Sequence, residues 1–169
     1  HLVSLGARVT VTPPRSAQAV LALEPDGLLV SSGPGDPREA ASTVAIVQEL
    51  VGRLPLFGIG LGCQILALAL GARVVPLSAG HHGYNYPVRG ADGPSVAITS
   101  QNHLYGIDGA SLAGTSLEMT ETNLFDGTVE GLRCTSAPAW GVLYQPEASP
   151  GPHDALHVLS GFVAATRTR

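Results

Sequence analysis

Lysine is absent from this chain of 169 residues, so its nine basic residues are all arginine. The arginines are scattered, and thirteen acidic residues bring the net charge to −4, which gives nucleic-acid binding no electrostatic support. Two cysteines, Cys63 and Cys134, are too few for a disulfide framework or a zinc knuckle. No apolar run approaches the length of a membrane span, and the first residues do not resemble a signal peptide. These absences predict a cytoplasmic protein with neither a nucleic-acid nor a membrane partner.

The composition predicts a single domain over residues 1–169, because 44% of the residues are hydrophobic and only 13% are charged. The opening HLVSLG is typical of the last turn of a helix closed by Gly6. We therefore expect the chain to begin inside an element, with earlier material absent.

Alternation and helical spacing predict the order of the elements. Strands are expected at 8–13 (RVTVTP), after 27 (GLLV) and at 55–59 (PLFGI). Helices are expected at 16–27, 38–51, 63–70 and 154–166. The continuous apolar strands indicate a mostly parallel α/β sheet covered on both faces. Short strand-like pieces from 86 to 145 indicate a mixed or antiparallel extension.

Three loops should meet beyond the carboxyl ends of the parallel strands, where open α/β sheets bind ligands. They are SSGPGDP (31–37), GIGLGCQ (58–64) and QPEASPGPHD (145–154). Gly33 and Gly35 could present backbone N–H groups to a developing negative charge, or form a simple turn. The GIGLG turn fits a dinucleotide fingerprint poorly, which leaves a strained strand-to-helix elbow or a plain glycine turn.

The chain resembles the glutaminase domain of the small subunit of carbamoyl phosphate synthetase, a class I glutamine amidotransferase. The resemblance rests on PDGLLVSSGPGDP, PLFGIGLGCQILALALGA, GHHGYNYPV, TSQNHLYGID, LFDGTVEGL and QPEASPGPHD, which occur in the family's order. It implies a flavodoxin-like fold of the class I amidotransferase type. Relative to the family, the first strand and a separate N-terminal domain are expected to be absent.

The family's catalytic pattern is broken in this sequence. The resemblance places Gly60 where the family has its nucleophilic cysteine and Gln145 where it has its histidine base, while the orienting Glu147 is retained. Glycine cannot attack and a glutamine side chain cannot accept a proton. Because losing one triad member typically costs on the order of 10⁴ or more in rate, glutaminase activity should be abolished.

The scaffold around these positions is largely retained. The resemblance implies a glutamine pocket without metal or cofactor, in which Leu104 replaces a glycine and crowds the substrate. Tyr84 and Tyr86 also replace smaller or more polar residues. The positions implied to bind substrate are Gly33, Gly35, Leu61, Gln64, Asn102, Leu104 and Tyr105.

Cys63 offers an alternative nucleophile, because it lies on the first helical turn, where a thiol pKa is lowered. His81, His82 or His103 would then be its base. The simpler interpretation, which we favour, is a small hydrophobic core residue.

Two hypotheses for function remain, besides the deliberate engineering of Gly60, Cys63 and Gln145. The first is a degenerate glutaminase-like domain that acts as structural or regulatory partner of a large synthetase-type subunit. The second is a repurposed enzyme that acts on another substrate in the remodelled pocket. In either case glutamine or another small molecule is the expected ligand.

Overall fold

The secondary structure begins with short elements and ends on a helix. The computed structural model describes residues 1–13, 15–91 and 93–167. In chain order the elements are α1 (Ala17–Leu21), β1 (Leu28–Val30), the 3-10 turn η1 (Pro37–Glu39), α2 (Ala41–Leu50), β2 (Leu56–Ile59), α3 (Leu61–Ala69), β3 (Val74–Gly90), β4 (Val96–Ile107), the 3-10 turn η2 (Gly109–Leu112), β5 (Leu117–Asn123), β6 (Val129–Cys134), β7 (Ala139–Val142) and α4 (His157–Thr166).

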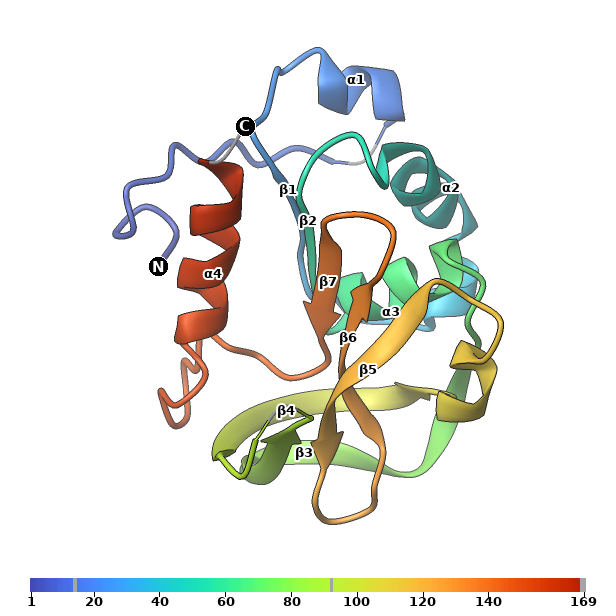
Figure 1. Cartoon of the computed structure of the whole chain (residues 1–169), viewed down its shortest axis with the longest axis vertical. Helices are drawn as coiled ribbons and strands as arrows, with labels where there is room; N and C mark the ends of the chain where they lie inside the picture. The colour runs from blue at the N-terminus through green and yellow to red at the C-terminus, as the bar shows by residue number, and fades with distance from the viewer. Residues whose placement is uncertain (14, 92, 168–169) are drawn as a thin grey trace.

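One seven-stranded sheet, in the order β1-β2-β7-β6-β5-β3-β4, organises the described residues (Figure 1). β1, β2 and β7 run parallel to one another. The remaining pairings, from β7 through β6, β5 and β3 to β4, are antiparallel. The predicted α/β class with an antiparallel extension is confirmed. The prediction of a mostly parallel sheet is wrong, because only two of the six pairings between the described strands are parallel and the strands from β3 to β7 pair with one another only antiparallel.

The parallel strands carry a hydrophobic core on each face, as their continuous apolar sequences predict. Leu56 on β2 packs into the core shared with α2 and α3. Its neighbour Phe57 belongs to the opposite core, beneath α4. There its ring centroid lies 5.7 Å from that of Phe162, which also contacts Trp140. In Figure 1, α4 accordingly lies on one side of the parallel strands and α3 on the other.

The strand predicted at 8–13 is wrong, because these residues form no regular element. Val9 and Val11 are 44% and 93% exposed, so the alternation in RVTVTP has no sheet face on which to bury its apolar side chains. Alternation alone does not stabilise a strand that lacks a hydrogen-bonding partner.

The helices begin close to where the sequence predicts them. Ser16 caps α1 by accepting a hydrogen bond from the Ala19 amide at 3.1 Å. The opening residues form a helical turn, closed by Gly6 at φ +88°. α4 begins three residues later than expected, at His157. Within the described ranges, no helix is long and apolar enough to cross a membrane.

Candidate active site

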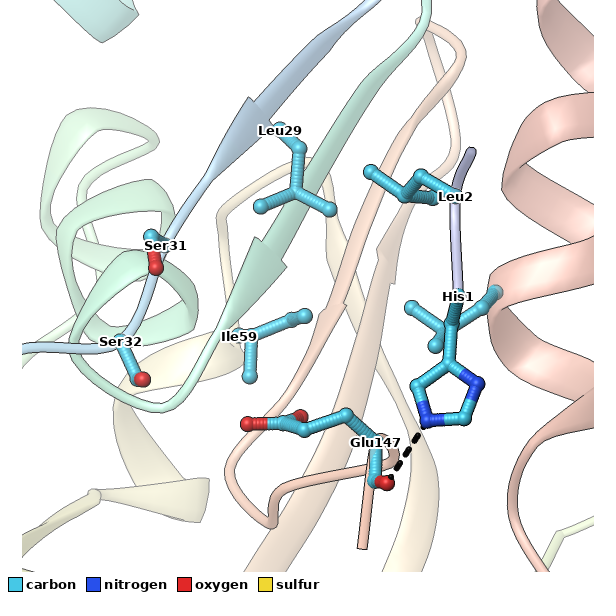
Figure 2. Close-up of a pocket in the computed structure, with 8 residues that line it drawn as sticks. His1, Leu2, Leu29, Ser31, Ser32, Ile59 and Glu147 are labelled. Carbon is cyan, nitrogen blue, oxygen red and sulfur yellow. Dashed lines mark hydrogen bonds between the residues drawn. The ribbon is translucent and has the colours of Figure 1, made fainter. Parts of the chain in front are cut away.

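The predicted meeting of loops is seen at the carboxyl ends of β1, β2 and β7. A cavity of about 190 Å³ lies there. Figure 2 shows the residues that line it. Ser32 comes from the loop after β1, Ile59 from the end of β2 and Glu147 from the loop after β7. The full lining is His1, Leu2, Leu29, Ser31, Ser32, Ile59, Glu147 and Leu159.

The GIGLG turn has the backbone of a strained strand-to-helix elbow. Its apex, Gly60, has φ +54° and ψ −115° and donates a 2.8 Å hydrogen bond from its amide to the Val142 carbonyl. A Cβ on Gly58 would lie 2.6 Å from the Gly62 carbonyl carbon, and a Cβ on Gly62 would collide with the Val30 carbonyl oxygen. Both flanking glycines are therefore required by close backbone packing.

The apex itself has more room than its neighbours. A Cβ on Gly60 would first meet the Cβ of Ser32, at 3.2 Å, and next the Leu143 carbonyl oxygen, at 3.7 Å. A small side chain therefore fits there if Ser32 shifts by a few tenths of an ångström. The elbow retains its strained conformation without the side chain that such a conformation normally presents.

Gln145 and Glu147 lie on the loop that follows β7. The backbone N–H of Gln145 donates to the Ser100 carbonyl at 2.9 Å, which fixes this loop against β4. The Glu147 carboxylate is directed towards Ser32 and Ile59 (Figure 2). Its Oε2 is buried and has no hydrogen-bond partner among the described residues. A buried carboxylate oxygen without a partner is unfavourable, so this oxygen lacks the donor that an orienting glutamate would hold.

The loop after β1 places Gly33 beside the elbow. A Cβ on Gly33 would lie 3.1 Å from Cδ2 of Leu61, the first residue of α3. Gly35 has φ +100°, which favours glycine. Asp36 holds the loop by accepting hydrogen bonds from the backbone and guanidinium of Arg38. That guanidinium keeps the pKa of Asp36 well below its usual range.

Several residues of α3 and β4 that were predicted to bind a substrate contact other parts of the protein. Gln64 is 3% exposed and donates through Nε2 to the Tyr105 carbonyl at 2.8 Å. The Asn102 side-chain oxygen lies 2.7 Å from Nδ1 of His82, whose nitrogen donates to it. Leu104 is 59% exposed. Gln64 is therefore engaged by the backbone of β4, and neither it nor Asn102 or Leu104 lines the cavity at the carboxyl ends of the parallel strands.

Cys63 lies in the core between α3 and the sheet and is completely buried. The Cys63 sulfur would lie 2.9 Å from a Cβ built on Gly141 of β7. The thiol therefore points from α3 towards the face of the sheet. Burial, with the nearby Glu130 and Glu121 carboxylates, raises its pKa well above the usual thiol value. A thiol in this position is neither ionised nor reachable by a substrate.

Three residues near these sites were not identified from the sequence. Ser32 borders the apex, and His1 lies with its Nε2 3.1 Å from the Glu147 carbonyl oxygen. Neither has a sequence signal. Glu130 is completely buried on β6, and a lone acid in the otherwise apolar VEGL was the one signal available. It joins His81 and His103 in a group whose ligating atoms lie within 4.8 Å of one another.

Comparison with known sequences points to one family. The model of the glutamine amidotransferase class-I family matches residues 1–165. The carbamoyl phosphate synthase small chain of Methanopyrus kandleri is 48% identical over 168 residues, which cover 99% of this chain and 46% of that protein. The corresponding chain of Staphylococcus saprophyticus is 46% identical, over 96% of this chain and 45% of its own. The chain thus spans less than half the length of these curated relatives.

Solved structures share the fold at low sequence identity. A putative GMP synthase component from Thermoplasma acidophilum matches with a TM-score of 0.78 and 22% identity, covering 99% of this chain and 86% of that one. A glutamine amidotransferase from Thermotoga maritima matches with a TM-score of 0.59 and 18% identity, covering 83% and 76%. These likenesses support the fold and carry no information on activity.

Proposed function

The chain belongs to the class I glutamine amidotransferase family, and we propose that it is a glutaminase-type domain without glutaminase chemistry. In this proposal it serves as a structural or regulatory partner of a large synthetase-type subunit. The observation that carries the proposal is Gly60, which occupies the apex of a strained elbow at φ +54° and ψ −115°. An elbow of this kind exists to expose a nucleophile, and glycine supplies none.

The base position supports the same conclusion. Gln145 offers an amide, which cannot take a proton from a thiol near neutral pH. Glu147 remains beside the cavity, with a buried Oε2 that has no partner among the described residues. Nucleophile and base are therefore both missing from the side chains, while the backbone that would position them persists.

The partner is proposed from the relatives. The two curated relatives described above are small chains of carbamoyl phosphate synthase, a name that implies a larger companion chain. A domain that does not hydrolyse glutamine would leave such a companion dependent on free ammonia. The vestigial pocket would bind glutamine or another small molecule.

The rival proposal is a repurposed enzyme with a different substrate. It rests on two bulky side chains at positions where the resemblance implies smaller or more polar residues, Leu104 and Tyr84, which are 59% and 58% exposed. The complete burial of Cys63 weighs against that residue as its nucleophile. We therefore favour the degenerate domain.

Glutamate release from glutamine tests the proposal, measured on the purified chain alone and with a large synthetase subunit. We expect no release in either sample, and co-purification of the chain with that subunit. Cys63→Ser is the control variant. Release that disappears in Cys63→Ser would establish a relocated nucleophile and reject the proposal, as would failure of the chain to bind the subunit.

A further inference from the structure

A group of buried polar side chains lies outside the elbow, in the antiparallel part of the sheet. His81 comes from β3, His103 from β4 and Glu130 from β6. His81 is 4% exposed and Glu130 is completely buried. We propose that His81, His103 and Glu130 bind a divalent transition-metal ion, of which Zn²⁺ has the most suitable chemistry.

The outer nitrogen of each histidine is held by an acceptor. His81 Nε2 lies 2.9 Å from Oδ2 of Asp126, and His103 Nδ1 lies 2.8 Å from the Tyr105 carbonyl oxygen. Both nitrogens must therefore donate, which leaves Nδ1 of His81 and Nε2 of His103 for an inner ligand. Metal-binding histidines show this arrangement, with the second ring nitrogen bound to a carboxylate or a backbone carbonyl.

The inner nitrogens face an atom that cannot donate to them. Oε1 of Gln101 lies 2.7 Å from His81 Nδ1 and 3.1 Å from His103 Nε2. The amide is fixed in this orientation because Gln101 Nε2 donates to the Thr99 hydroxyl, which itself donates to the Tyr86 carbonyl. Each inner nitrogen therefore needs either its own proton or a shared cation.

A neutral imidazole carries one ring proton. On His103 this proton lies on Nδ1, which donates to the Tyr105 carbonyl. A neutral His103 presents a lone pair to the Gln101 oxygen, which is a repulsive contact. A metal ion between them converts this repulsion into two favourable interactions.

Glu130 supplies the third ligand. Its Oε1 accepts a hydrogen bond from Nδ2 of Asn123 at 2.8 Å and lies 3.4 Å from His81 Nδ1. Its Oε2 is buried without a hydrogen-bond partner among the described residues. This orphaned oxygen is an independent sign of a missing ligand, because buried carboxylate oxygens are normally satisfied.

Binding an ion requires the three ligating atoms to move closer together and the Gln101 oxygen to move away from the two histidine nitrogens. The three ligating atoms lie within 4.8 Å of one another. Bonds of about 2.0–2.2 Å to a tetrahedral Zn²⁺ place ligand atoms about 3.3–3.6 Å apart. Two imidazoles and one carboxylate form a ligand set that zinc prefers, with Gln101 or a water in the fourth position. The ion would link β3, β4 and β6 through His81, His103 and Glu130. On β4, His103 lies between Asn102 and Leu104 in the sequence.

Titration of the chelator-treated chain with Co²⁺ and Zn²⁺ tests this proposal. His1 is an exposed histidine outside the group and could bind the ion on its own, so the parent for all measurements is His1→Ala. We expect one Co²⁺ per chain, with the strong visible absorption of tetrahedral coordination, displaced by Zn²⁺. His103→Asn and Glu130→Gln should each weaken binding at least about 100-fold, more than the loss of an outer partner.

Two further variants keep the test decisive if a buried substitution prevents folding. Asp126→Asn changes a half-exposed outer partner and should weaken binding about 10–100-fold. His157→Asn removes an exposed histidine outside the group and should change nothing. The proposal is overturned if His1→Ala binds no ion saturably, or if folded His103→Asn or Asp126→Asn binds Co²⁺ as tightly as the parent.

Discussion

At the scale of single residues, the two cysteines occupy different chemical environments. Cys63 is completely buried, with a pKa raised well above the usual thiol value by burial and by Glu130 and Glu121. Burial also raises the pKa of Cys134, but hydrogen bonding with Ser116 and Ser136 outweighs this effect and lowers it overall. Cys134 therefore ionises more readily than Cys63.

This difference predicts the order of thiol labelling. In the native protein, a disulfide reagent should label Cys134 first, and labelling of Cys63 should stay slow as the pH rises to about 9, since the reactive species is the thiolate. Addition of denaturant should expose both thiols equally. Quantification with Cys134→Ala and Cys63→Ala as matched variants checks this. Rapid native labelling of Cys134→Ala would show that Cys63 is accessible and ionised.

At the scale of elements, the elbow and its helix depend on glycine to different degrees at neighbouring positions. A methyl group on Gly62 collides with backbone, the Val30 carbonyl, which cannot rotate away. At Gly60 the nearest atom is the Ser32 side-chain carbon at 3.2 Å, and the cost is mainly the left-handed φ of +54°.

Gly62→Ala should therefore destabilise the protein more than Gly60→Ala. We expect about 1–3 kcal/mol from the strained backbone at Gly60 and about 3 kcal/mol or more from overpacking at Gly62. Urea denaturation of both variants gives the two free energies of unfolding. Equal losses would contradict the close approach of α3 to β1.

The helix α4 covers one face of the parallel strands through its aromatic contact. Phe162 is 5% exposed, and its ring lies against those of Phe57 and Trp140. Phe162→Ala should cost about 3–5 kcal/mol of unfolding free energy, because it opens a cavity in this core. Ser160→Ala, an exposed change on the same helix, should stay within about 0.5 kcal/mol. A similar midpoint for both variants in thermal denaturation would show that α4 is not part of the cooperative core.

At the scale of the whole molecule, the layout of loops could be predicted from the sequence, and the contacts between distant strands could not. PLFGI reads as a buried parallel strand because its apolar run is continuous, and this places the elbow at its carboxyl end. RVTVTP alternates equally well and yet remains irregular, since a strand also requires a partner. The approach of Glu130 to His81 depends on the register of β3, β4 and β6, which no local pattern specifies.

The same reasoning applies to the site. The sequence identified the loops that carry Gly33, Gly60 and Glu147, because the carboxyl ends of parallel strands converge. It did not reveal that Gln64 is engaged by the Tyr105 carbonyl or that Ser32 borders the apex. Those contacts are tertiary, and only the packed structure defines them.

If the glutaminase scaffold persists while its reactive side chains are gone, then restoring those side chains should restore some activity. The deciding measurement is the rate of glutamate release from glutamine by the unmodified chain and by Gly60→Cys/Gln145→His, which restores a nucleophile and a base. Glu147 remains in place to orient the new histidine. We expect no release by the unmodified chain and measurable release by the double variant. Release by the unmodified chain at a rate equal to or above that of the double variant would contradict the loss of glutaminase chemistry.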